Sequence, residues 1–214
     1  METDPGVFEI MYSTRAMRRL KPDPVPDELI HRILKAGTSA ANGGNRQPWR
    51  FLVIKDPQIK QGVQQYYKRG FDEVVSASYT QNPPPPGVSQ EAYSRQHAAV
   101  QYLTEHYHEA PVWIVACQMG GASVSGRSEG ASIYPSVQNM LLAARALGLG
   151  ATLTTRHLLF AKEVEEIMGL PEGVHSYAIL PIGYPMGRFG PVGRGAIADI
   201  VYLDKWGESY PGLE

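Results

Sequence analysis

The chain is organised around the stretch Ser39-Ala-Ala-Asn-Gly-Gly-Asn-Arg-Gln-Pro-Trp-Arg-Phe51, which joins a helix expected over 27–37 to a strand expected over 50–55. Its two glycines let the backbone adopt conformations that other residues avoid and approach a ligand closely. Its side-chain amides offer both hydrogen-bond donors and acceptors. This composition favours a loop that contacts a flat ligand edged with heteroatoms, and an ordinary polar connection is the alternative.

Before this loop, the segment Ser13–Lys21 carries four cations among apolar residues: Arg15, Arg18, Arg19 and Lys21. Alternation with Ala16, Met17 and Leu20 indicates that part of the segment is packed. An arginine fixed beside apolar neighbours is suited to phosphate, because its guanidinium stays charged and binds two oxygens at once. The segment therefore predicts a phosphate site, with a solvated charged surface as the alternative.

Residues 66–110 are rich in tyrosine and are interrupted by Gln81-Asn-Pro-Pro-Pro-Pro-Gly87. The prolines forbid regular structure, so we expect a helix, a protruding loop and a return helix over 89–108. An excursion of this length is often a lid over a site, although it could also be a surface elaboration that packs on itself. His106 and His108 would point to different sides of a helix, with no cysteine nearby, so no metal site is predicted.

The second half of the chain is predominantly apolar. Buried strands are expected over 112–117 and 177–182, and a short strand over 151–155. Between them come a loop over 120–126 and a helix over 128–147 that is apolar on nearly all sides. Such a helix is buried either centrally or against a second subunit. The tail from Ala196 is too apolar for a free end and is expected to dock, on this protomer or on another.

Composition sets further bounds. The chain has 214 residues, of which 43% are hydrophobic, and this suits a single domain over 1–214. A net charge of −1 argues against a nucleic-acid-binding surface, and one cysteine excludes an internal disulfide. Neither a signal peptide nor an apolar run long enough to span a bilayer is apparent, so a cytoplasmic protein is expected.

Taken together, these segments resemble the FMN-dependent nitroreductase family. The resemblance lies in the order and spacing of Arg15-Ala-Met-Arg-Arg-Leu20, Lys21-Pro-Asp-Pro-Val-Pro26, Asn42-Gly-Gly-Asn-Arg-Gln-Pro-Trp49, the helix 136–150 and Leu180-Pro-Ile-Gly-Tyr-Pro185. It implies an α+β fold, with a nitroreductase-like mixed β-sheet surrounded by helices. It also implies a homodimer with a domain-swapped C-terminal tail, the long central helix at the interface, and two sites that are each built from both chains.

The resemblance also assigns residues to FMN. Arg15 and Arg18, beside Ala16, would hold the phosphate and ring edge, with Arg19 as an alternative to Arg18, and Arg194 would close on the phosphate. The loop of Asn42, Gly43, Gly44 and Asn45 would be lent by the partner subunit, with Gln47 supporting it. The backbone of Leu153, Thr154 and Thr155 would lie against one face of the ring, where a main-chain N–H would reach the flavin N5.

The chain departs from the family pattern in two places. Ala16 stands where the family often has serine, and Thr14 where it often has another arginine, so one hydroxyl and one charge are missing from the phosphate grip. Thr155 and Arg156 stand where many members have an acidic residue and glycine, which bears on the substrate side of the site. Phe71, Tyr79 and Arg156 are the candidate substrate-binding residues.

The implied function is an NAD(P)H-dependent FMN oxidoreductase that reduces nitroaromatics, quinones or similar flat electrophiles by a ping-pong mechanism. The flavin carries the chemistry, so no catalytic side chain is assigned. The alternatives are a reductive dehalogenase or other single-substrate flavoenzyme, for which Glu91, Tyr93 and Arg95 could supply charges, the flavin-destroying synthase of the benzimidazole base, and a module that stores flavin or senses redox state. The acceptor, the choice between NADH and NADPH, and replacement of FMN by a deazaflavin stay open.

Overall fold

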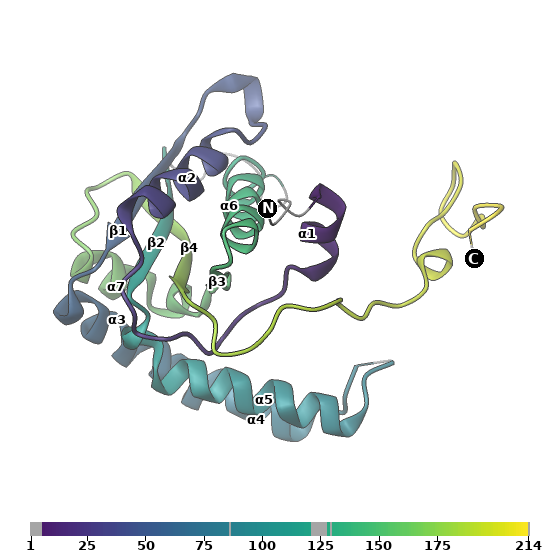
Figure 1. The fold of residues 1–214 in the computed structure, drawn as a ribbon, viewed down its shortest axis with the longest axis horizontal. Helices are drawn as coiled ribbons and strands as arrows, with labels where there is room; N and C mark the ends of the chain where they lie inside the picture. Colours follow the sequence, from purple (N-terminus) through teal and green to yellow (C-terminus); the bar gives the residue numbers. More distant parts are fainter. Residues whose placement is uncertain (1–5, 86, 121–127, 129, 214) are drawn as a thin grey trace, which may run out of the picture.

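A four-stranded sheet with the order β1-β2-β4-β3 forms the centre of the molecule (Figure 1). This computed structural model describes residues 6–85, 87–120, 128 and 130–213. The strands are β1 (Trp49–Ile54), β2 (Val112–Met119), β3 (Gly150–Ala151) and β4 (Val174–Gly183). All of the described pairings are antiparallel. The α+β class is thus confirmed, whereas the expected mixture of parallel and antiparallel pairs is absent from the described strands.

The apolar run at the start of β2 is buried on both faces of the sheet. Val112, Ile114 and Ala116 face one hydrophobic cluster, and Trp113, Val115 and Cys117 face the other. Alternate residues of a strand point to opposite faces, so a run this apolar requires cover on both sides. The helices supply that cover, and the sheet lies between two helical layers.

On one face, α2 (Asp27–Thr38) packs against α6 (Ile133–Ala146). A Cβ at Gly37 would lie 2.8 Å from Met140 Cγ and 3.0 Å from Ser136 Oγ, so glycine allows the two helices to approach closely. The prediction that α2 ends at Gly37 is therefore wrong by one residue, because this glycine is a packing contact inside the helix.

On the other face lie α3 (Pro57–Gly70), α5 (Gln90–Glu105) and α7 (Ala161–Ile167). Asp56 caps α3 by accepting hydrogen bonds from the N–H groups of Gln58 and Ile59. A π-helical turn over Phe71–Val75 continues α3 into α4 (Ser76–Gln81). Residues 82–85 have no regular structure, and α5 then returns to the sheet. The predicted helix, loop and return helix are confirmed, and the role of a lid stays a prediction.

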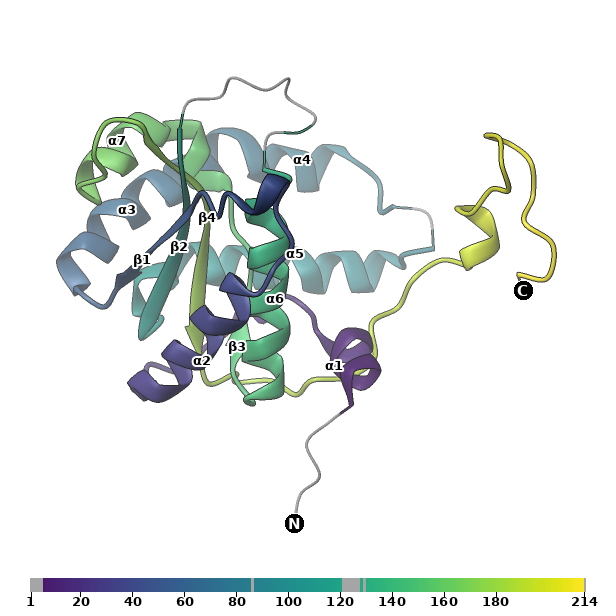
Figure 2. The same cartoon turned by 90° about the horizontal axis from the view of Figure 1, so that it is seen from above.

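Both ends of the chain lie apart from the sheet. Helix α1 (Val7–Ser13) and the segment after β4 leave the body on the same side, and the C-terminal tail projects away from it (Figures 1 and 2). In the tail Ile200 is 74% exposed and Trp206 is 89% exposed. The tail therefore does not dock on its own protomer, and docking on another protomer stays a prediction.

Helix α6 is buried along one stripe, made by Ile133, Val137, Met140 and Ala144, while its other sides are half-buried or exposed. Central burial on all sides is thus wrong for this protomer, and burial against a second subunit stays a prediction. The helix begins at Ile133, five residues later than expected, because Gly130 takes a positive φ of 82° just before it. No helix in the described ranges is long and apolar enough to cross a membrane.

The structure differs from the sequence expectation at residues 151–155, and it describes little of residues 120–126. The strand expected over 151–155 pairs as a ladder only at Gly150 and Ala151, and an isolated bridge joins Thr154 to Ile179 farther on. The loop expected over 120–126 lies outside the described residues except for Gly120.

Candidate functional site

Arg18 lines three adjoining cavities beside the end of the sheet. The arginine cavity, of about 650 Å³, is lined by Arg15, Arg18, Arg19, Arg95 and Arg194 among others. The α6 cavity, of about 330 Å³, includes Ala16, Gln138, Arg145 and Phe189. The aromatic cavity, of about 390 Å³, includes Tyr67, Tyr79 and residues 152–156. Because Arg18 belongs to all three and Thr152 to two, one ligand could extend through them.

The loop that carries Arg15, Arg18 and Arg19 is fixed by its apolar residues. Met17 and Leu20 are buried, and the Met17 N–H donates to the Ala151 carbonyl at 3.0 Å. A Cβ at Gly150 would lie 2.8 Å from Leu20 Cδ2 and 2.9 Å from Met17 Cβ, so the loop lies directly against β3. With Met17 and Leu20 anchored against β3, the side chains of Arg15, Arg18 and Arg19 line the arginine cavity.

The arginine cavity has an excess of positive charge, since no carboxylate is among its lining residues and, of its five arginines, Arg95 alone has a carboxylate partner among the described residues, Glu91. Arg18 makes no hydrogen bond or ion pair with another described residue. Among the described residues, Arg15 and Arg194 donate only to main-chain carbonyls, those of Arg188 and Gly193. Arg19 lies over the Tyr102 ring, 4.9 Å from its centroid. Uncompensated guanidinium groups around one cavity create a positive potential that favours an anion such as phosphate.

Arg145, which sequence reasoning missed, adds a further cation in the α6 cavity. Its Nε donates to Ser13 Oγ at 2.9 Å, its guanidinium lies 4.4 Å from the Phe189 ring centroid, and Glu9 is 3.9 Å away. A cation in the last turn of α6 is typical of helix termini, so its sequence position gave no sign of a ligand role.

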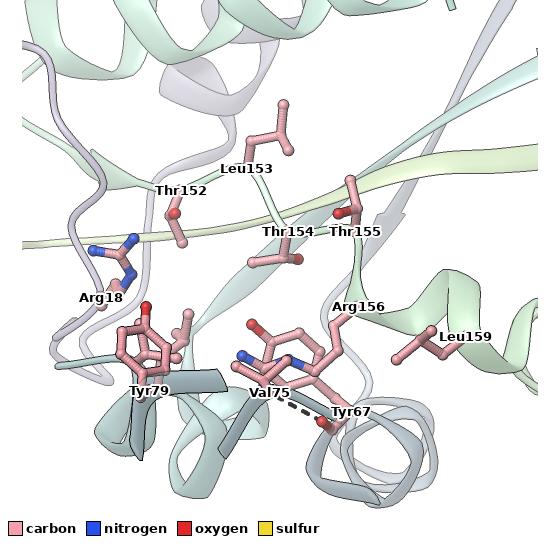
Figure 3. Close-up of a pocket in the computed structure, with 12 residues that line it drawn as sticks. Arg18, Tyr67, Val75, Tyr79, Thr152, Leu153, Thr154, Thr155, Arg156 and Leu159 are labelled. Atoms are coloured by element: carbon pink, nitrogen blue, oxygen red, sulfur yellow. Dashed lines mark hydrogen bonds between the residues drawn. The ribbon is translucent and has the colours of Figure 1, made fainter. Parts of the chain in front are cut away.

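The aromatic cavity has a polar main-chain wall and an aromatic wall. Figure 3 shows Thr152 to Thr155 along one side, Tyr67, Val75 and Tyr79 along the other, and Arg18 and Arg156 entering from opposite ends. Phe71 is not among the residues that line this cavity, and its ring lies beneath the guanidinium of Arg156. The π-helical turn brings Val75 into the lining instead, a position that sequence reasoning missed.

The N–H and the hydroxyl of Thr154 both form hydrogen bonds within the protein interior. Its N–H donates to the Ile179 carbonyl at 3.0 Å, and its hydroxyl lies 2.6 Å from both the Ile179 carbonyl and Tyr107 Oη. Of the three residues expected to offer a main-chain N–H to the flavin, Thr154 is therefore excluded. The N–H groups of Leu153 and Thr155 have no acceptor within the described part of the chain, and they are the remaining candidates.

The loop of Asn42, Gly43, Gly44 and Asn45 lines none of the three cavities. It lies at the N-terminal end of α6, where the Gly43 N–H donates to Ser132 Oγ at 3.2 Å. The arginines lie at the opposite end, beside Arg145. A 14-residue helix is about 20 Å long. Within one protomer the predicted site is thus divided into two groups at opposite ends of α6.

This loop has a conformation that few residues adopt. Asn45 and Gln47 take φ values of 50° and 49°, which are uncommon for residues other than glycine. The Asn42 side-chain oxygen accepts the Gln47 N–H at 2.8 Å and holds the turn closed, and the supporting role of Gln47 stays a prediction. Strained backbone of this kind is concentrated at functional sites.

A family model described as the nitroreductase family matches residues 11–184, and the chain belongs to that family.

Two relatives show the range of the family. Iodotyrosine deiodinase 1 of Rattus norvegicus is 27% identical over 184 residues, which are 83% of this chain and 61% of the relative. This chain thus spans about three fifths of the length of the deiodinases it matches. A protein of Archaeoglobus fulgidus, provisionally named as an NADH dehydrogenase/NAD(P)H nitroreductase, is 24% identical over 93% of this chain and 98% of its own length.

Solved structures agree on the fold. An oxidised iodotyrosine deiodinase bound to FMN and 3-iodo-L-tyrosine superposes with a TM-score of 0.74 at 23% identity, covering 94% of this chain and all (100%) of the other. A nitroreductase with bound FMN from Desulfitobacterium hafniense DCB-2 gives a TM-score of 0.69 at 20% identity, over 95% and 100% of the two chains.

The described residues also fit a flavin mononucleotide chemically. Arginines without carboxylate partners match its phosphate, and unpaired main-chain N–H groups beside aromatic side chains match a flat ring with acceptors at its edge. No cluster of three or more His, Cys, Asp or Glu side chains suitable for a metal occurs among the described residues.

Proposed function

We propose that this chain is an FMN-dependent oxidoreductase that uses NAD(P)H to reduce flat electrophilic acceptors, with nitroaromatics and quinones as the default class. The observation that carries the proposal is the group of uncompensated arginines around Arg18, adjoining a cavity with a main-chain wall and an aromatic wall. Bound FMN would accept electrons from NAD(P)H and pass them to the acceptor in separate half-reactions.

In this proposal Arg15, Arg18 and Arg194 hold the phosphate, with Arg19 and Arg145 adding positive potential. Guanidinium groups that are already ordered lose little freedom when an anion binds. Arg145 is ordered by Ser13 and Phe189, and Arg15 by the Arg188 carbonyl. Leu153 and Thr155 offer N–H donors to the ring, and the tyrosines of the opposite wall contact the acceptor and exclude water.

We further propose a homodimer in which each site takes its Asn42–Asn45 loop from the partner subunit. The loop is about the length of α6 from the arginines of its own chain, yet it has the strained backbone of a ligand-binding segment. A two-fold axis would bring the loop of one chain to the arginines of the other at both sites at once. Exposed apolar residues of α1 and the tail, including Phe8 and Trp206, supply surface for this contact.

Reductive dehalogenation is a second candidate, favoured by the deiodinase relatives and by the deiodinase structure with 3-iodo-L-tyrosine. An amino-acid substrate carries an ammonium group, and no carboxylate is among the residues that line the aromatic cavity. Glu91 and Arg95, which could supply charges to an amino-acid zwitterion, form an ion pair with each other on α5. The composition of the aromatic cavity therefore favours the nitroreductase type of reaction.

The test begins with the purified protein. A visible flavin spectrum, about one FMN per chain, and rapid oxidation of NADH or NADPH with a nitroaromatic acceptor are expected. Tyrosine release from 3-iodo-L-tyrosine with little nitroaromatic turnover would favour the dehalogenase. Tight FMN with slow turnover of every acceptor would favour a storage or sensing module, and loss of the yellow colour under oxygen would favour flavin destruction. A colourless preparation that does not bind added FMN would refute the proposal.

A further inference from the structure

Arg156 places a half-buried cation in the wall of the aromatic cavity and holds it in a fixed position. Its Nη1 donates to Thr104 Oγ1 at 2.7 Å and to the Tyr67 carbonyl at 3.4 Å. Its guanidinium lies 4.1 Å from the Tyr67 ring centroid and 5.2 Å from that of Phe71. A Cβ at Gly70 would be 3.0 Å from Arg156 Cγ, so glycine makes room for the side chain. The guanidinium is therefore ordered before any ligand binds.

Part of the hydrogen-bonding capacity of Arg156 is unused. An arginine has five N–H donors, and the two bonds of Nη1 leave those of Nε and Nη2 without an acceptor among the described residues. The Nε and Nη2 donors form one edge of the planar fork, and such an edge binds the two oxygens of a carboxylate side by side. Figure 3 shows the side chain extending into the cavity above Tyr67.

The charge of Arg156 is also uncompensated. No aspartate or glutamate is among the lining residues of the aromatic cavity, and Arg18 brings a second cation to it. Burial lowers the pKa of the Arg156 guanidinium, while Tyr67, Tyr107 and Tyr79 oppose this lowering and the like charge of Arg18 adds to it only as the smallest cause. Removing a cation from water without a partner costs free energy, which an anionic ligand group would offset.

The rest of the lining suits a flat apolar body. Tyr67 and Tyr79 supply rings, and Val75, Val100, Leu103 and Leu159 supply aliphatic surface. We propose that Arg156 is a specificity-determining residue that binds a carboxylate on the acceptor, so that this site selects aromatic electron acceptors that are acids. The inference rests on the proposed oxidoreductase function, because it names the class of acceptor for that site. Arg156 holds the carboxylate, which is unchanged by the reaction.

Matched acceptors test the inference in the holoenzyme: 4-nitrobenzoate, which is an anion, and 4-nitrobenzamide, which is neutral and of similar shape. NAD(P)H supplies the hydride and solvent the proton that convert either nitro group to a nitroso group and water. Arg156→Gln should lower kcat/KM for 4-nitrobenzoate by about 10- to 100-fold, mainly through KM, because a charged hydrogen-bonded pair is lost. In the same variant, kcat/KM for 4-nitrobenzamide should change by less than about threefold.

The matched control is Arg69→Gln. Arg69 also lies over an aromatic ring, at 4.6 Å from the Phe160 centroid, but it has its own carboxylate partner in Glu73 and does not line the aromatic cavity. Arg69→Gln should leave kcat/KM unchanged for both acceptors. Arg156→Lys keeps the charge and loses the fork, so it should retain part of the preference for the anion.

Calorimetric titration with benzoate and benzamide gives a readout that is independent of turnover. Benzoate should bind the wild-type holoenzyme at least about tenfold more tightly than benzamide, and Arg156→Gln should remove the difference. If Arg156→Gln does not fold, the wild-type comparison and Arg156→Lys decide instead. Equal affinity of the wild type for benzoate and benzamide would overturn the inference. So would an equal fall in kcat/KM for both acceptors in Arg156→Gln, because Arg156 would then only hold Tyr67 in place.

These outcomes separate the inference from the proposed function. Rapid turnover of both acceptors without an effect of Arg156→Gln on their ratio would refute anion selection while the oxidoreductase proposal stands. Failure to oxidise NAD(P)H with either acceptor, together with benzoate binding that depends on Arg156, would refute the oxidoreductase proposal and leave anion binding in place.

Discussion

Arg15 and Arg194 come from opposite ends of the chain and line the same two cavities. Replacing both with alanine should remove bidentate phosphate contacts worth about 1.5–3 kcal/mol each and leave a largely colourless protein. Flavin released per chain on denaturation measures the effect, and Arg32→Ala on the exposed side of α2 is the control. Unchanged flavin content in the double variant would contradict the phosphate assignment.

His157 should make stability depend on pH. It is fully buried, its Nε2 lies 3.2 Å from Ser176 Oγ, and the Ser176 hydroxyl donates to Glu165. Ser176 can therefore only accept from His157 Nε2–H, which leaves Nδ1 without a partner among the described residues. Burial lowers the pKa of His157 from 6.5 to about 4, with Glu165 acting weakly in the opposite direction. A proton on Nδ1 would also have no acceptor among the described residues, so nothing local offsets the cost of charging the buried ring.

The unfolded chain takes up this proton near pH 6.5 and the folded chain only near pH 4. Protonation therefore stabilises the unfolded state relative to the folded state as pH falls between these values. We expect the free energy of unfolding to fall by about 2 kcal/mol between pH 8 and pH 5 on account of His157. Urea unfolding at several pH values measures it, with His157→Asn as the non-titrating comparison. If the free energy of unfolding changed with pH equally in the wild type and in His157→Asn, His157 would not be the origin of the pH dependence.

At the scale of elements, the contact between α2 and α6 depends on Gly37. Valine at this position would meet Met140 and Ser136 at less than van der Waals distance, so Gly37→Val should destabilise the protein by about 1–3 kcal/mol. Helix propensity alone would favour valine over glycine. Thermal unfolding measures the difference, and Lys35→Val, at an exposed position of the same helix, controls for propensity. A neutral or stabilising Gly37→Val would show that the helices can separate without loss.

At the scale of the whole molecule, the division of the site between the two ends of α6 predicts complementation between subunits. One chain would carry Arg15→Ala with Arg194→Ala, and the other Asn42→Ala with Asn45→Ala. Each homodimer should lose FMN at both sites. A heterodimer isolated through two different tags should have one site with both defects and one intact site, and so bind about one FMN per dimer.

This result would distinguish shared sites from sites within one chain. If arginines and loop of the same chain formed each site, both sites of the heterodimer would carry one defect and the protein would bind no FMN. A colourless heterodimer, with wild-type dimers of the same two tags as the yellow control, would therefore contradict the proposed arrangement.

Most helices and strands, and the residue types offered at the proposed site, could be predicted from the sequence. Periodicity, proline and glycine placed most of these elements within about five residues, because these signals act locally. The type of residue in Ser13–Lys21 was enough to predict an anion site, since guanidinium chemistry does not depend on the fold. Local signals failed at Gly37, where the glycine of an apparent helix end serves a distant helix.

Which residues share a cavity could be seen only in three dimensions. The tertiary structure brought Arg145, Tyr67 and Val75 to Arg18, turned the Thr154 N–H inward to Ile179, and left Arg156 on Tyr67 without a carboxylate. It also separated the Asn42–Asn45 loop from the arginines by the length of α6. Such relations depend on contacts between residues far apart in the chain, which hydrophobic packing sets in three dimensions and which no local pattern of residues encodes.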